Sequence, residues 1–147
     1  MKTVRQLLQV KGHDVWSIAP DASIYDALRL MAEKEVGALL VLEAGSLVGI
    51  ISERDFARKV LLKGEFSQDT PVRELMTSRV LYVRPDQTVE DCMALMTDKR
   101  VRHLPVLDGD QLVGVISIGD VVKATIAEKD FIIEQMENYI TGVRPYF

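Results

Sequence analysis

The sequence has few of the residues on which several common kinds of site depend. Among 147 residues there is one cysteine, Cys92, and there are two histidines, His13 and His103. One cysteine excludes an intramolecular disulfide, and so few cysteine and histidine side chains exclude a Cys/His zinc cluster. We therefore expect no metal site, and we expect Cys92 to be buried on an apolar helix face.

Excess basic charge and long apolar runs are also lacking. The formal net charge is −4, from 18 Lys and Arg against 22 Asp and Glu. Binding of a phosphate backbone needs a basic stripe, so we expect no nucleic-acid and no membrane partner. Runs such as GALLVL are too short to cross a bilayer, and the N-terminus lacks the apolar region of a secretion signal. We expect a cytoplasmic protein.

What the sequence does contain is an internal repeat. A shift of 65 positions lays residues 20–55 over residues 85–120 without a gap, and 16 of the 36 positions are identical. The match ends on two heptads, GIISERD (49–55) and GVISIGD (114–120). Similarity at a fixed spacing indicates a duplicated structural unit.

Each copy predicts the element order β-α-β-β-α from its apolar periodicity and its turn residues. The helical crossover predicts a parallel pair of strands, and the hairpin adds an antiparallel one. We expect an α+β fold in which the two units pack as a pseudo-two-fold pair, because one unit encloses too little core. The expected strands are Val15–Ile18, Ala38–Leu42 and Leu47–Ile51 in the first copy, and Val80–Val83, Leu104–Leu107 and Leu112–Ile116 in the second.

Flanking segments complete the predicted organisation. The two ends each carry a helical apolar stripe, and the segment between the copies starts with the polar stretch KGEFSQDT. The expected parts are an N-terminal helix and lead-in (1–14), the first repeat (15–63), a linker (64–76), the second repeat (77–125), and a C-terminal helix and tail (126–147).

A tandem β-α-β-β-α repeat whose third strand ends in G-h-h-S-x-x-D resembles the CBS domain, named for cystathionine β-synthase. The resemblance rests on the two heptads, on Met76-Thr77, on VRHLPVLD (101–108) and on the Pro-Asp-x-Ser/Thr helix starts. It covers most of residues 15–125. It implies a CBS pair, or Bateman module, that binds AMP, ADP, ATP, a dinucleotide such as NAD, or S-adenosylmethionine, and that forms a homodimer.

The heptads have the chemistry that an adenosine compound needs. One carboxylate accepts both ribose hydroxyls, and a phosphate binds hydroxyl, arginine and helix N-terminal N–H groups. By resemblance, the Ser and Asp of one copy act with strands of the other. The implied first site is Ser52, Arg54, Asp55, Thr77, Val80, Arg102, His103, Leu104 and Pro105. The implied second site is Ser117, Asp120, Val15, Trp16, Gly37, Ala38 and Leu39.

The two implied sites differ in charge. Arg102 and His103 correspond to Gly37 and Ala38 in the alignment of the copies, and Arg54 corresponds to Gly119. We therefore expect the first site to take a phosphorylated adenosine. The second site would take an adenosine group more weakly, or one part of a dinucleotide.

Structural interpretations of the same residues stay open at this point. Each Ser-x-x-Asp is also an ordinary helix cap, which is compatible with ligand binding by the serine. His103 is alternatively a structural residue at a strand start, and Trp16 a core or interface residue.

The leading functional interpretation is a non-catalytic adenine-nucleotide sensor that acts on an unknown protein effector by population shift. A dimerisation or protein-interaction module with vestigial pockets is the main alternative. A small nucleotide-processing enzyme is the weaker one, because the sequence offers no paired carboxylates with a base, no Cys–His couple and no Walker A loop. We therefore expect no catalytic residue.

Overall fold

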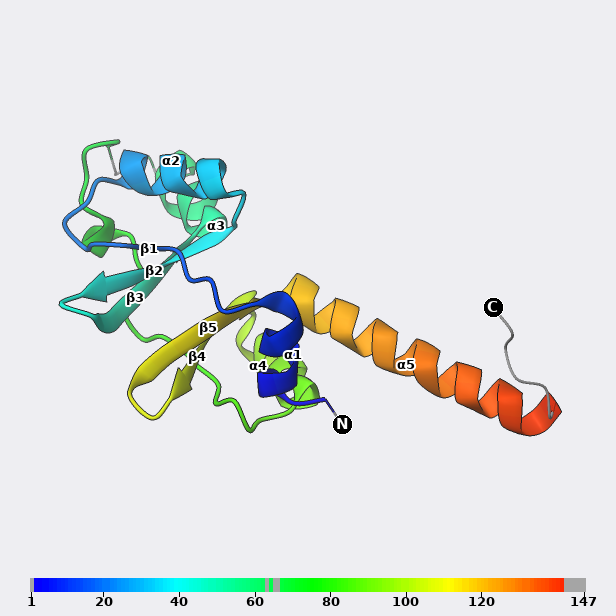
Figure 1. Ribbon diagram of the computed structural model, residues 1–147. Coiled ribbons are helices and arrows are strands. Elements are labelled where there is room, and N and C mark those ends of the chain that lie inside the picture. The colour runs from blue at the N-terminus through cyan, green and yellow to red at the C-terminus, as the bar shows by residue number, and fades with distance from the viewer. Residues whose placement is uncertain (1, 63, 65–66, 142–147) are drawn as a thin grey trace.

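The computed structural model describes residues 2–62, 64 and 67–141, and it contains two lobes, one for each repeat (Figure 1). The elements of the first lobe are β1 (Ser17–Ile18), α2 (Ile24–Lys34), β2 (Ala38–Glu43) and β3 (Ser46–Ser52). The sheet order is β1-β2-β3, with β1 parallel to β2 and β3 antiparallel to β2. Helix α2 is capped at Ser23, whose Oγ accepts a hydrogen bond from the Asp26 N–H at 3.0 Å.

The second lobe repeats this plan with a shorter sheet. Its elements are α4 (Val89–Lys99), β4 (His103–Asp108) and β5 (Gln111–Ser117). The register of the β4–β5 hairpin shifts between Val106 and Leu107, at the position that corresponds to the shift between Val41 and Leu42. The expected strand Val80–Val83 is wrong: only Val83 pairs, in parallel with Val106, and Val80 and Leu81 line a cavity instead. The α+β fold of two like repeats is confirmed.

Each lobe is completed by a segment that precedes the other repeat. Helix α1 (Val4–Lys11) comes before the first repeat, yet Val4, Leu7 and Leu8 lie in the core of the second lobe. Conversely, Val72 and Leu75, in and after the short helix η2 (Val72–Glu74), lie in the core of the first lobe. The second half of the predicted linker (64–76) thus contributes apolar side chains to the first core. The exchange ties the two lobes together.

The glycines of the two heptads allow these segments to approach. A Cβ on Gly49 would lie 2.5 Å from the Met76 sulfur, and a Cβ on Gly114 would lie 2.8 Å from Leu8 Cδ2. Real side chains essentially never show such contacts, so any larger residue would push the exchanged segment away from the sheet. The two glycines thus serve the packing of the lobes.

The helices after the two heptads differ in length and form. In the first lobe, the single turn α3 (Glu53–Asp55) leads into the π-helix η1 (Phe56–Leu61). In the second, α5 (Ile118–Thr141) is one continuous helix of 24 residues. The separate C-terminal helix expected from residue 126 is therefore wrong, because no glycine or proline interrupts residues 120–141.

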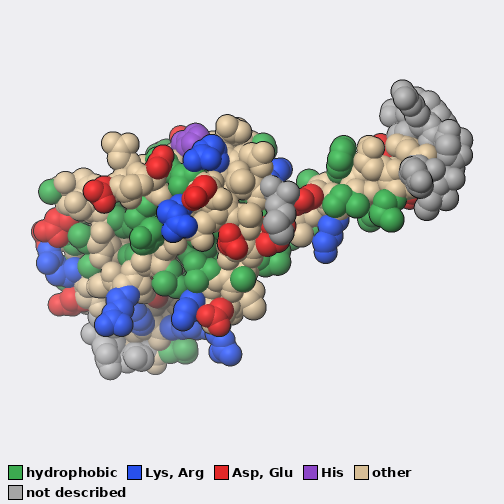
Figure 2. All heavy atoms as spheres, turned by 90° about the horizontal axis from the view of Figure 1, so that it is seen from below, with side chains coloured by type: hydrophobic (Ala, Val, Ile, Leu, Met, Phe, Trp, Pro, Cys, Tyr) green, Lys and Arg blue, Asp and Glu red, His purple; other side chains and the backbone are tan. Residues whose placement is uncertain are grey.

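Helix α5 extends away from both lobes (Figure 1), and it carries exposed apolar side chains (Figure 2). The exposed members beyond the second lobe are Ile126, Phe131, Ile132, Ile133 and Met136. The apolar stripe predicted for the C-terminal helix also includes Tyr139 and Ile140, which belong to α5 but whose side chains are outside the described part of the structure. Within the described part of the chain, no helix is long and apolar enough to cross a membrane.

Candidate ligand-binding cavities

Two cavities open between the lobes. The first cavity has a volume of about 440 Å³, and the second has a volume of about 400 Å³. The first contains the Ser-x-x-Asp of the first repeat, and the second contains that of the second repeat. Each is closed by residues of the other repeat, which is the arrangement that the resemblance implies.

The first heptad forms a reciprocal helix cap. The Ser52 N–H donates to Asp55 Oδ2 at 2.8 Å, and the Ser52 hydroxyl donates to the same oxygen at 3.0 Å. The Asp55 N–H in turn lies 3.3 Å from Ser52 Oγ, which accepts its hydrogen bond. The capping interpretation is therefore confirmed. The cap uses Oδ2 of Asp55, and the Lys59 ammonium lies 3.8 Å from Oδ1.

Arginine dominates the first cavity. Five arginines line it against the carboxylates of Glu53 and Asp55. Arg54 and Arg102 were predicted for this site, and the sequence analysis missed the other three, although Arg79 adjoins the predicted Val80. The five are Arg54, Arg58, Arg79, Arg100 and Arg102. The lining is cationic in a protein whose net charge is −4, so the cavity favours a polyanionic ligand.

The structure brings seven of the nine predicted first-site residues to this cavity. The seven are Ser52, Arg54, Asp55, Thr77, Val80, Arg102 and His103. Leu104 and Pro105 do not line it, because both are buried on β4, with Leu104 in the core of the second lobe. The apolar surface of the cavity comes instead from Ile50, Val80, Leu81 and Val101.

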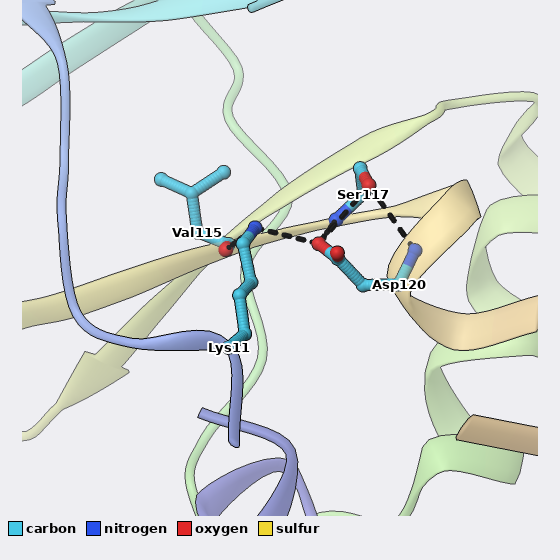
Figure 3. Close-up of polar contacts among 4 residues, drawn as sticks. All are labelled: Lys11, Val115, Ser117 and Asp120. Atoms are coloured by element: carbon cyan, nitrogen blue, oxygen red, sulfur yellow. Dashed lines mark hydrogen bonds and ion pairs between the residues drawn. The ribbon is translucent and has the colours of Figure 1, made fainter. Parts of the chain in front are cut away.

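The second heptad forms the same cap with one addition. Asp120 Oδ2 accepts from the Ser117 N–H at 2.8 Å and from the Ser117 hydroxyl at 3.0 Å. The Lys11 ammonium also donates to Asp120 Oδ2, at 2.5 Å, and to the backbone oxygen of Val115, at 2.5 Å (Figure 3). Burial opposes ionisation of Asp120, but the hydrogen bonds from Lys11 and Ser117 outweigh it and lower the pKa of this carboxyl.

The second cavity is acidic, unlike the first. Lys11 is its one lysine or arginine among the described residues, and three carboxylates line it, from Asp14, Glu35 and Asp120. The sequence analysis missed Lys11, Asp14 and Glu35. Five of the seven predicted second-site residues line the cavity: Ser117, Asp120, Trp16, Gly37 and Ala38. Val15 does not, and Leu39 is buried in the core of the first lobe.

Trp16 and His103 are not ordinary core residues. Trp16 is 38% exposed at the second cavity, and the Lys34 ammonium lies 4.5 Å from the centre of its ring. His103 lines both cavities, as Gly37 and Ile50 also do. Burial lowers the pKa of His103 below 6.5, and the charges of Lys11 and Arg102 add to this effect. These effects favour the neutral imidazole over the charged form.

The remaining titratable group of interest is Cys92, which is buried on α4 as expected. Burial raises the pKa of the Cys92 thiol to about 11, with the nearby carboxylates of Asp91 and Glu90 adding to the shift. The thiol is therefore protonated at neutral pH and is a poor nucleophile.

This fold and these paired cavities define a ligand-binding module made of two like repeats. Both repeats match the family model of the CBS domain, over residues 6–62 and 72–127. The chain belongs to the CBS domain family. As a CBS pair, it is a regulatory ligand-binding module.

Known proteins of this family resemble the chain over most of its length. The CBS domain-containing protein CBSX3, mitochondrial, of Arabidopsis thaliana is 37% identical over 95% of this chain and 72% of its own. The crystal structure of the CBS domain protein NE2398 is 54% identical, with a TM-score of 0.82, over 86% of this chain and 99% of its own. The structure of CBSX2 in complex with AMP is 30% identical, with a TM-score of 0.72, over 88% and 99%.

Proposed function

We propose that the protein is a non-catalytic sensor of an adenine nucleotide, which it binds in the first cavity. The observation that carries the proposal is the arginine lining around a Ser-x-x-Asp cap. Guanidinium groups bind phosphate oxygens through paired, charge-assisted hydrogen bonds. Five arginines against two carboxylates favour ADP or ATP over AMP, and an NAD-type dinucleotide over the cationic S-adenosylmethionine. The AMP complex of CBSX2 supports the adenosine part.

Each part of such a nucleotide has a partner in the cavity. Asp55 Oδ2 is held by Ser52, which leaves Oδ1 to accept the ribose hydroxyls. The apolar side chains of Ile50, Val80 and Leu81 provide the slot that an adenine ring requires. The phosphates would lie against the arginines, which remain exposed enough for binding to weaken with salt.

Regulation would follow from the shared construction of the cavity. Ser52 to Asp55 come from the first repeat, whereas Thr77, Arg79 and Arg102 belong to the second. One direct link across this cavity is the hydrogen bond from Arg54 Nη1 to the Arg100 backbone oxygen, at 3.4 Å. A nucleotide held by both repeats would favour one relative arrangement of the lobes, and a protein effector would respond to that arrangement.

We also propose that the chain forms a homodimer through α5. This helix carries exposed apolar side chains, such as Phe131, which is 61% exposed, and Met136, which is 58% exposed. Among the described residues, no other part of the chain covers them. A charged residue in a buried apolar contact is costly, so Phe131→Glu should dissociate the dimer. Sedimentation of the wild type and the variant tests this: a dimer and a monomer are expected, and a monomeric wild type would refute it.

Isothermal titration tests the nucleotide proposal. We expect ATP to bind more tightly than AMP, and Asp55→Asn to weaken ATP binding by about tenfold because one charged hydrogen bond is lost. Asn keeps an oxygen for the Ser52 cap, so the fold is preserved. Asp120→Asn, in the second cavity, is the matched control and should leave ATP affinity unchanged.

Three results would contradict the proposal. Equal losses in Asp55→Asn and Asp120→Asn would exclude the first cavity as the main site. The absence of any thermal shift with AMP, ADP, ATP, NAD or S-adenosylmethionine would favour the interaction module with vestigial pockets. Release of ADP or phosphate on incubation with ATP would instead favour the enzyme.

A further inference from the structure

The second cavity contains a lysine that the first cavity lacks. Lys11 is the last residue of α1, and α1 is held on the second lobe by the buried Leu7 and Leu8. The contact between Leu8 and Gly114 fixes the helix close to β5. Lys11 therefore belongs to a rigid element, and its ammonium is directed at Asp120 and Val115 (Figure 3).

The corresponding place in the first lobe is built differently. There the N–H of Thr77 donates to the Ile50 backbone oxygen at 2.9 Å, in a strand-like bridge. Ile50 corresponds to Val115 in the alignment of the repeats, but the Val115 oxygen accepts from Lys11. The residue that corresponds to Lys11 is Met76, whose uncharged side chain packs against Gly49. The repeats thus differ by one ammonium group at this place.

That ammonium neutralises the carboxylate on which nucleoside binding would depend. Asp120 Oδ2 already accepts two hydrogen bonds from Ser117, and Lys11 adds a charged one at 2.5 Å. A carboxylate paired with an ammonium is a weaker acceptor at Oδ1 as well, so ribose hydroxyls, which are neutral donors, gain less from it than from an unpaired carboxylate. In the first cavity, by contrast, Lys59 lies 3.8 Å from Asp55 Oδ1 and is not part of the lining.

We propose that Lys11 is an internal plug that closes the second cavity to nucleosides, so that the CBS pair binds ligand in the first cavity alone. The statement that ligand binds in the first cavity alone rests on the proposed function. Whether Lys11 closes the second cavity to nucleosides is tested separately. A phosphate group should not bind Lys11 in place of Asp120 either. The second cavity has three carboxylates, from Asp14, Glu35 and Asp120, against one ammonium, and this excess of negative charge repels an anion. The ligand that fits the unplugged cavity is a neutral nucleoside, adenosine.

The test uses the full chain and adenosine as the probe. The protein is first saturated with ATP, and adenosine is then titrated calorimetrically. Wild type should bind adenosine at least tenfold more weakly than Lys11→Met, which introduces the residue of the other repeat and should bind one adenosine per chain. Adding Asp120→Asn to Lys11→Met should remove that binding, because Asp120 is the ribose acceptor.

Controls separate the plug from general effects of the substitution. Lys99→Met makes the same chemical change at an exposed ion pair with Asp98 and should not create adenosine binding. Lys11→Gln keeps a long polar side chain, and it replaces Lys11→Met if that variant fails to fold by circular dichroism. Gln should open the cavity less than Met, because its amide still donates a neutral hydrogen bond.

The outcomes distinguish this inference from the proposed function. Adenosine binding to ATP-saturated wild type, equal to that of Lys11→Met, would overturn the plug, as would folded Lys11 variants that bind no adenosine. Weaker nucleotide binding in Lys11→Met would mean that Lys11 is a phosphate ligand and would also overturn it. If wild type binds no ATP, the proposed function fails, while the adenosine titrations still decide whether Lys11 closes the second cavity.

Discussion

The two cavities are made from corresponding residues of a duplicated unit, yet their charges are opposite. Both contain a Ser-x-x-Asp cap with nearly identical hydrogen bonds, 2.8 and 3.0 Å to Oδ2 in each case. Around that shared element, five arginines line the first cavity and three carboxylates with one lysine line the second. The duplication therefore kept the residues that build the helix start and changed those that would meet a ligand.

The same comparison separates structural from functional use of the heptad. The glycine, the serine and the aspartate have a packing or capping role in both lobes, so their repetition alone is no evidence of binding. What distinguishes the lobes is the neighbour of each carboxylate. The Lys59 ammonium lies 3.8 Å from Asp55 Oδ1, whereas the Lys11 ammonium lies 2.5 Å from Asp120 Oδ2 and donates a hydrogen bond to it.

The largest effects on stability are expected from substitutions in the two exchanged segments that complete the cores of the lobes. Leu8 in the second core and Leu75 in the first are 1% and 0% exposed. Leu8→Ala and Leu75→Ala should each lower the free energy of unfolding by about 2–5 kcal/mol, because buried leucine is replaced by a cavity. Urea unfolding measures this. Val10→Ala, on α1 but 81% exposed, is the control, and an equal loss there would contradict the account.

A smaller effect is expected from the charge of the first cavity. Arg79→Gln and Arg102→Gln should each weaken ATP binding by about tenfold at low salt, or about 1.4 kcal/mol. The loss should shrink as salt rises, because exposed charges are screened. Calorimetric titration at two salt concentrations measures both. Arg29→Gln, an exposed position on α2 that pairs with Asp26 and Glu33, should have no effect, and equal losses would contradict the charge argument.

The smallest expected effect is on the pH dependence of stability that comes from Asp120 in the second cavity. The pKa of Asp120 is lowered in the folded protein, so its ion pair stabilises the fold above the unfolded pKa near 3.8 and is lost as pH falls through the folded pKa. Lys11→Met should raise this pKa and cost about 1 kcal/mol or less at pH 7, since the pair is partly exposed. The difference should vanish at low pH. A carboxyl titration by NMR in which both proteins gave the same pKa would contradict it.

Much of the fold was predictable because it depends on local periodicity and on the repeat. The hairpins, the capped helices and the two-lobed α+β plan follow from apolar spacing and turn residues. The exchange of α1 and residues 72–76 between lobes was not predictable, because local pattern does not show which of two similar sheets an apolar segment covers. The continuity of α5 could have been predicted, because residues 120–141 contain no glycine or proline.

The candidate site was predictable only as far as the repeat alignment reached. Arg54, Arg102 and His103 stood out because their counterparts in the other copy are Gly119, Gly37 and Ala38. Lys11 lies before the aligned window, and its partner Asp120 is 109 positions away in the chain. Its only sequence clue is the correspondence with Met76. Leu104 and Leu39 were assigned to the sites, but alternation along β4 and β2 directs them into the cores.

The asymmetry of the two cavities is tested most directly by native mass spectrometry of the purified protein saturated with ATP. The method counts both the chains in each assembly and the nucleotides bound to them. The account predicts one ATP per chain in the wild type and in Asp120→Asn, and a lower occupancy in Asp55→Asn when ATP is reduced to a concentration that just saturates the wild type. Two ATP molecules per chain in the wild type, one of them lost in each variant, would contradict it.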